Sequence, residues 1–208
     1  MDEADATAAP DTLTIELDPP VSHKGGVLDA LHLREPTLGE VRLAEALMKA
    51  LAPSPADERA YQQKLVSLVA GIAPDAVGDL PASKLVRAVQ FLEGFILAPA
   101  ADGGGEGTAA DPPPDALAIE LDPPIEQQRV SYDALALREP TARQVEAAEV
   151  KLKAQRTPAD IRDYQVALLQ SVSGLPVTVI RALPIRKAME GVRYLEGFLR
   201  PARAIGAS

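Results

Sequence analysis

The stretch TLTIELDPPV (residues 12–21) returns later in the chain as ALAIELDPPI (residues 116–125). It decides the fold because the sequence that follows it is duplicated too. LDALHLREPT is matched by YDALALREPT at the same offset of 104 residues, and FLEGFI is matched by YLEGFL at an offset of 103. A match over roughly eighty residues with one single-residue gap is too long to arise by chance. The chain therefore contains two copies of one module, at residues 12–98 and 116–200.

The residues outside the two modules are predicted to be tails and a linker. Residues 1–11 are small and acidic, which is typical of a disordered N-terminal tail, and residues 201–208 form a short C-terminal tail. Residues 99–115 combine a glycine run with three consecutive prolines, as expected of an interdomain linker. The glycine run does not fit a phosphate-binding loop, because no strand precedes it and no Lys-Ser/Thr pair follows it.

Composition excludes several classes of function. The net charge is −9 and no basic cluster is present, so nucleic acid and anionic membranes are poor partners. There is no cysteine, which rules out disulfides and thiolate metal sites and fits a cytoplasmic protein. No apolar run is long enough to cross a membrane, and the acidic start is unlike a signal peptide. The charge is uneven, since residues 1–104 hold 16 acidic and 8 basic residues.

Each module begins with a pattern typical of a β-hairpin. Apolar and polar residues alternate over residues 13–17 and again over residues 31–34, which indicates two half-buried strands. The dipeptide Pro19-Pro20 must break or kink the first strand, because proline donates no ladder hydrogen bond.

Helices are predicted after the hairpin. Thr37 is a good N-cap with Glu40 three residues later, and Thr141 and Gln144 repeat this capping box. Apolar residues from Val41 to Leu51 then share one face of a first helix. Two further helices follow in each copy, one starting at a Ser-Pro or Thr-Pro pair and one at the end of the module, with a short helical turn between them. The module is thus ββααα, a hairpin followed by a small helical bundle, and the fold class is α+β.

This order of elements resembles a known family, the small tail assembly chaperones of contractile-tailed phages and prophages. The resemblance covers nearly all of both modules and rests on the following residues: Leu31–Thr37 and Leu135–Thr141 (L-x-LREPT), Gly71-Ile72 with Leu80-Pro81, and Gly174-Leu175 with Leu183-Pro184. Members of that family are usually single modules, so the tandem duplication is a departure from its pattern.

The resemblance implies a non-enzymatic protein of the bacterial host cytoplasm. Such a chaperone keeps the tape-measure protein soluble during tail-tube assembly, helps recruit the tail-tube protein, and needs no cofactor or metal. The alternative that stays open is a structural adaptor retained in the phage-like particle. Catalysis finds no support in the residues, because His23 and His32 are replaced by Gln127 and Ala136 in the second copy. Both histidines are expected to be exposed.

Two groups of residues are candidates for partner binding. The first comprises Arg34, Glu35, Arg138 and Glu139, identical in both copies. These residues either pair with neighbours at the joint between hairpin and helix or lie on a partner-binding face. A catalytic role for the carboxylates lacks a recurring second acid or base.

The second group comprises the aromatic residues of the final helix: Phe91, Phe95, Tyr194 and Phe198. Glycine inside a helix costs about 1 kcal/mol relative to alanine, so Gly94 and Gly197 predict close packing. The contact is either within the module or with the other module or a client. We also expect the two modules to pack together as an intramolecular pseudo-dimer, because both end in an apolar helix.

Overall fold

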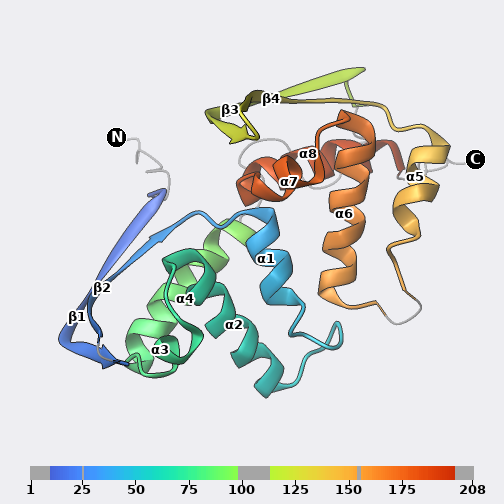
Figure 1. Cartoon of the computed structure of the whole chain (residues 1–208). Helices are drawn as coiled ribbons and strands as arrows, with labels where there is room; N and C mark the ends of the chain where they lie inside the picture. The colour runs from blue at the N-terminus through green and yellow to red at the C-terminus, as the bar shows by residue number, and fades with distance from the viewer. Residues whose placement is uncertain (1–9, 25, 98–112, 154–155, 200–208) are drawn as a thin grey trace, which may run out of the picture.

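The computed structural model describes residues 10–24, 26–97, 113–153 and 156–199, and shows two modules of the same architecture (Figure 1). Within these residues no helix is long and apolar enough to span a membrane. The first module contains β1 (Thr12–His23), β2 (Gly26–Arg34), α1 (Leu38–Glu45), α2 (Pro55–Ala70), α3 (Pro74–Gly78) and α4 (Ala82–Leu97). The second contains β3 (Ala116–Gln127), β4 (Val130–Arg138), α5 (Ala142–Glu149), α6 (Pro158–Ser173), α7 (Val177–Ala182) and α8 (Ile185–Leu199). The α+β class is confirmed.

Each hairpin is an antiparallel pair with an irregularity in the middle. In β1, the register to β2 shifts between Glu16 and Val21, where the Asp18–Pro19 peptide bond is cis. The second hairpin repeats both features between Glu120 and Ile125. The prolines therefore do not end the strand but produce a bulge, and the strand resumes its pairing beyond them.

Local signals set the helix ends. Thr37 and Thr141 form complete capping boxes with Glu40 and Gln144, as expected. Gly71 closes α2 with φ +67°, a left-handed conformation that glycine adopts without strain, and Gly174 does the same for α6. The first helix is shorter than predicted: α1 stops at Glu45, and the side chains of Leu47 and Leu51 are exposed beyond it.

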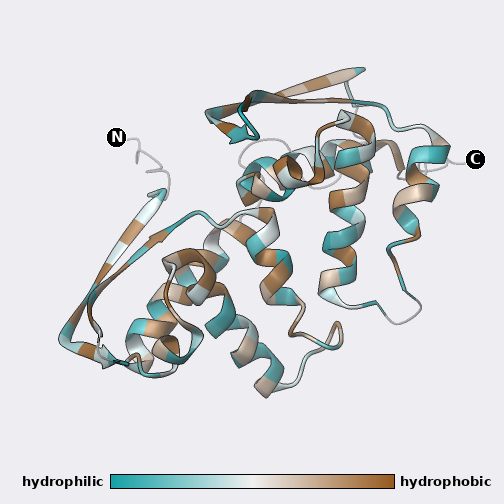
Figure 2. Ribbon diagram, in the orientation of Figure 1, coloured by the Kyte–Doolittle hydropathy of each residue, from teal (hydrophilic) through white to brown (hydrophobic). Residues whose placement is uncertain are grey.

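The inward faces of hairpin and helices form one continuous apolar core. Ile15 and Leu31 from the first hairpin are fully buried with Leu65 of α2 and Leu92 of α4. Figure 2 shows the same alternation along both hairpins, with hydrophobic and hydrophilic residues following one another. At 3% aromatic content, the core consists mainly of leucine, valine and alanine.

The modules contact each other through α1. This helix packs on α2 of its own module and also on α6, α7 and α8 of the second, and α4 touches α8 (Figure 1). The two modules are not related by a two-fold contact in which each packs its first helix on the other. Within the described residues, α5 makes no comparable contact with α2, α3 or α4, and it lies on the far side of α6 from the first module.

We expect Leu92→Ala to lower the free energy of unfolding by about 2–5 kcal/mol, because Leu92 is fully buried and its loss leaves a cavity in the core. Leu97→Ala is the matched control. Leu97 lies five residues along the same helix and is 75% exposed, so its loss should change stability by less than about 0.5 kcal/mol. Urea unfolding followed by circular dichroism measures both, and equal effects would contradict the core described above.

Candidate partner-binding site at the joint between the modules

The segment from Glu35 to Glu45, here called the joint segment, lies on the second module. Its backbone makes a short antiparallel β-bridge at Thr37 and Pro184. The Leu38 N–H donates to the Leu183 carbonyl at 2.9 Å, and the Ile185 N–H donates to the Pro36 carbonyl at 2.9 Å. Both donors begin a helix and lack an intrahelical acceptor. The contact therefore provides a hydrogen-bond acceptor for one unpaired backbone N–H at the start of a helix in each module.

Gly39 allows the close approach of α1 to α7. A Cβ atom at this position would lie 2.9 Å from the Arg181 carbonyl oxygen and 3.1 Å from the Arg181 Cβ. The first of these atoms belongs to the backbone, which cannot move aside as a flexible side chain can. In the second copy the equivalent residue is Arg143, so only the first module has a helix that fits this surface.

Two ion pairs flank α1. The Arg42 guanidinium donates to both Asp163 carboxylate oxygens, at 2.9 and 2.7 Å, in a bidentate pair. One turn further, Arg162 Nε donates to both oxygens of Glu45 at 3.1 Å. Arg162 also donates to Gln165 Oε1 at 2.9 Å. These pairs fix both the rotation of α1 about its axis and its position along α6.

Burial changes the chemistry of Glu45. Its side chain is 8% exposed, and removal from water raises the pKa of this carboxyl to about 7, although the nearby Arg162 charge acts in the opposite direction. The Tyr61 hydroxyl lies in the same region, and burial together with Glu45 and Glu93 raises its pKa as well. The interface thus contains a carboxyl that titrates near neutral pH.

Glu35 and Phe95, two of the predicted partner-binding residues, meet at Arg186 of the second module. The Glu35 carboxylate accepts hydrogen bonds from the Arg186 backbone N–H at 2.7 Å and from its Nε at 3.0 Å. The Arg186 guanidinium lies over the Phe95 ring, 5.0 Å from its centroid. Phe91 stacks edge-on against Phe95 at 5.0 Å. In this copy, two candidate residues, Glu35 and Phe95, therefore line the contact between the modules, and Phe91 packs against one of them.

Arg34 has a local structural role. Its Nη1 and Nη2 donate to the Glu40 carboxylate at 2.9 and 2.6 Å, and Nη1 also donates to the Glu35 carbonyl. The same carboxylate completes the capping box of α1. Hydrogen bonding to Glu40 raises the pKa of Arg34. This is the first of the two interpretations of the Arg-Glu dipeptide: it orders the turn from hairpin to helix.

The second copy differs at the same joint. Gln144 replaces Glu40, and its Nε2 donates to the Ser171 carbonyl instead of binding an arginine. Arg138 and Glu139 are both exposed, with no side-chain hydrogen bond or ion pair among the described residues. The sequence identity of the two dipeptides therefore does not carry over into identical contacts.

The final helices also differ between copies. The Tyr194 hydroxyl donates to the Pro114 carbonyl at 2.8 Å, and Phe198 packs edge-on against Tyr194 at 5.2 Å. A Cβ on Gly197 would lie 2.8 Å from the Pro113 ring, so close packing is confirmed there. The expectation is wrong for Gly94, where a Cβ would meet nothing within 4 Å. Close packing at this glycine is thus a property of the second module alone.

The histidines behave unequally. His32 is exposed as expected, whereas His23 is wrongly assigned to the surface, since its side chain is 16% exposed and its Nδ1 lies 2.8 Å from an oxygen of Asp79. Within the described residues, no group of three metal-ligating side chains comes together.

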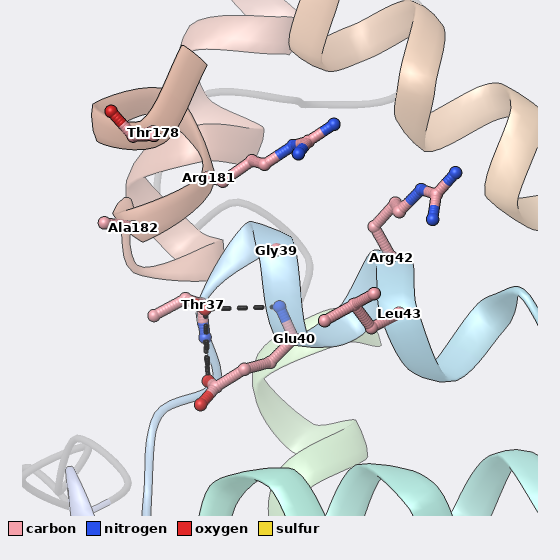
Figure 3. Close-up of a pocket in the computed structure, with 8 residues that line it drawn as sticks. All are labelled: Thr37, Gly39, Glu40, Arg42, Leu43, Thr178, Arg181 and Ala182. Atoms are coloured by element: carbon pink, nitrogen blue, oxygen red, sulfur yellow. Dashed lines mark hydrogen bonds between the residues drawn. The ribbon is translucent and has the colours of Figure 1, made fainter. Parts of the chain in front are cut away.

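A pocket of about 330 Å³ opens beside the joint segment, between α1 and α7 (Figure 3). Thr37, Glu40 and Leu43 line one wall, and Thr178 and Arg181 line the other. Figure 3 shows the guanidinium groups of Arg181 and Arg42 extending toward the same side. The pocket is a by-product of how α1 lies on α7, because both walls come from residues of the contact or next to it.

Sequence reasoning missed the residues that carry this contact: Arg42, Glu45, Arg162, Asp163 and Arg186. The requirement that a site residue recur in both copies excluded three of them. Arg42, Asp163 and Arg186 have Glu146, Ala60 and Ser83 as their counterparts. A contact that each chain makes only once leaves no repeated signal. For Arg42, Asp163 and Arg186 the useful signal was the difference in charge from the matching position of the other copy, whereas Glu45 and Arg162 gave no such signal.

We expect the two halves to stay together after the linker is cut. A protease site placed within residues 99–111 should yield halves that still co-elute from a sizing column. Arg42→Asp or Asp163→Arg alone should weaken the association of the cut halves about tenfold, and the double exchange should restore most of it. Halves that separate in the wild type, or an exchange without recovery, would contradict the contact.

The raised pKa of Glu45 predicts a dependence on pH. The carboxyl binds its proton more tightly in the folded protein than in the unfolded chain, so ionisation opposes folding. The stability of the wild type relative to Glu45→Gln should therefore fall as pH rises from about 4.5 to above 7, by about 3 kcal/mol in total. Denaturant unfolding of both proteins at several pH values measures the difference, and a constant difference would contradict the assignment.

Comparison with known proteins agrees with the duplicated architecture. A family model described as "Phage tail assembly chaperone proteins, E, or 41 or 14" matches residues 14–97 and again residues 118–200. No curated protein and no solved structure matches the chain significantly. The two matches cover most of the chain and coincide with the two modules, each a hairpin followed by helices that pack beneath it. The chain therefore belongs to the phage tail assembly chaperone family, and carries the family's module twice.

Proposed function

We propose that the protein binds the tape-measure protein and keeps it soluble while the tail tube assembles in the bacterial host cytoplasm. Membership of the family supports a role in tail assembly. The observation that carries the more specific proposal is the joint segment, because the second module holds an amphipathic helix on the surface formed by α6, α7 and α8. A module that binds one helix in this way is suited to binding others.

The chemistry of that contact fits a helical client. Leu38, Val41 and Ala44 of α1 are fully buried where this helix packs between α2 of its own module and the second module, while Arg42 and Glu45 are held by ion pairs to the second module. This is the pattern of helix-in-groove recognition, in which apolar anchors supply affinity and polar pairs fix register. A tape-measure protein exposes long apolar helical faces until the tube encloses it, and such faces promote aggregation.

The surface charge supports the same role. A net charge of −9 favours solubility of the chaperone and of any complex that it forms. We propose a non-enzymatic mechanism: the protein covers apolar faces, contacts the tail-tube protein as the tube grows, and is released without any covalent step.

Co-expression tests the proposal. The tape-measure protein encoded in the same gene cluster should be mostly insoluble alone and mostly soluble with this chain, and the two should co-purify. The solubilised fraction is measured by comparing supernatant and pellet on gels. Asp133→Asn, an exposed change on β4, should behave as the wild type does. Equal solubility with and without the chain would contradict the proposal.

Particle composition separates a chaperone from an adaptor that stays in the particle. Mass spectrometry of purified particles should find this chain absent or far below the amount of the tape-measure protein. A stoichiometric amount in finished particles would favour the adaptor.

A further inference from the structure

The first module has a face equivalent to the one that holds α1 in the second module. By the repeat, this face, here called the open face, consists of Arg59 and Ala60 of α2, Gly78 of α3, and Ala82, Ser83 and Val86 of α4. Their counterparts in the second module are Arg162, Asp163, Arg181, Ile185, Arg186 and Met189. These counterparts include the residues that contact the joint segment.

Exposure shows that no described element covers the open face. Ile185 is fully buried in the second module, whereas its counterpart Ala82 is exposed. The Arg162 side chain is 12% exposed, whereas Arg59 is exposed and has no ion pair among the described residues. Val86 is 53% exposed. Among the described residues, the same surface is therefore covered by α1 in one module and left uncovered in the other.

The repeat also places the open-face residues next to one another. In the second module, Arg162 Nη1 lies 3.0 Å from Met189 Sδ, so the side chains from α6 and α8 meet. The matching positions in the first module are Arg59 on α2 and Val86 on α4. These two helices also pack against each other. The repeat thus places a cation and an apolar residue at corresponding positions of two neighbouring helices, and both residues are exposed.

We propose that the open face binds an amphipathic helix of the client protein, with a client carboxylate opposite Arg59. The second module shows the chemistry: Arg162 binds the Glu45 carboxylate of the helix that lies there. A second carboxylate fits at the start of α4. There Ser83 corresponds to Arg186, whose backbone N–H binds Glu35. The inference rests on the proposed function and names the surface that would perform it.

The differences between the two faces define the client helix further. Ala60 stands where the second module has Asp163, so the open face does not recruit an arginine as Asp163 recruits Arg42. Ala82 and Val86 are smaller than Ile185 and Met189. The open face is therefore less polar and has more room, and it suits a helix with larger apolar residues than α1 carries.

A second copy of this chain fits the open face poorly. The helix that it would offer is α5, in which Ala142 replaces the fully buried Leu38, so two small surfaces would meet and leave space between them. Arg143 replaces Gly39, and any Cβ at that position approaches the partner backbone too closely. The contact between modules is therefore made once within the chain and is not repeated from chain to chain.

Site-specific photocrosslinking in the full chain tests the inference. Val86 is replaced by benzoylphenylalanine, the chain is co-expressed with the tape-measure protein of its gene cluster, and crosslinked products are identified by mass spectrometry. We expect a crosslink to the tape-measure protein from position 86 and none from position 130, an exposed valine on the second hairpin. A crosslinked dimer of this chain, or no crosslink at position 86 despite solubilisation, would overturn the inference and leave the proposed function standing. Absence of solubilisation would instead count against the function itself.

Charge reversal provides a second measurement. Arg59→Glu should weaken co-purification of the tape-measure protein about tenfold or more, and Arg59→Lys should retain most of it. Arg193→Glu, which makes the same change in net charge at an exposed position of α8, should bind as the wild type does. The circular dichroism and melting temperature of all three variants should match the wild type. Equal binding by Arg59→Glu and Arg193→Glu would overturn the inference.

Discussion

The arrangement of the chain depends on two backbone hydrogen bonds, between Leu38 and Leu183 and between Ile185 and Pro36. Each joins a helix start in one module to an extended residue in the other. Proline at position 36 favours extended geometry in the residue before it, which prevents α1 from continuing backward and leaves the Pro36 carbonyl free to accept. Because the Leu38 N–H has no acceptor within its own helix, the second module completes the first turn of α1. The position of α1 and the ion pairs along it follow from this exchange.

Duplication has produced a heterologous contact rather than a two-fold one. A heterologous contact between identical modules generates an open chain or a ring, because each module keeps a free copy of both surfaces. Here sequence differences between the modules prevent such open chains or rings, because the unused copies of both surfaces no longer match. Arg143 stands in place of Gly39, Ala60 in place of Asp163 and Ser83 in place of Arg186. The two modules retain one fold and have acquired unequal roles: the first contributes the helix, and the second contributes the surface that holds it.

The sequence predicted the elements that local chemistry determines. Alternation located the hairpins, the Thr-x-x-Glu and Thr-x-x-Gln boxes located two helix starts, and Gly71 marked a helix end. The length of α1 was overestimated because Leu47 and Leu51 continue an apolar spacing without being buried. The contact between modules could not be predicted, because it pairs residues about 120 positions apart in the chain. Arg42 and Asp163 have Glu146 and Ala60 as their equivalents, and the Glu45–Arg162 pair recurs in type as Glu149 and Arg59, so no rule of recurrence identifies both pairs. Residues that are identical in both modules identify what the shared fold requires. A contact that occurs once in the chain is indicated only by the positions at which the two modules differ.

The polar character of the contact bears on how the protein works. Burying Glu45 and Arg162 costs desolvation energy that their attraction offsets only in part, so such pairs fix geometry more than they add stability. A contact built only from leucine and isoleucine would hold α1 more tightly, yet it would tolerate sliding along α6 by a turn. The pairs at Arg42 and Glu45 permit one register alone, which keeps the first module, and with it the open face, in one orientation. Under the proposed function the chain binds a client helix and later releases it, which requires a rigid frame and a moderate affinity. A polar joint between the modules would provide that frame without adding apolar surface that competes for the client.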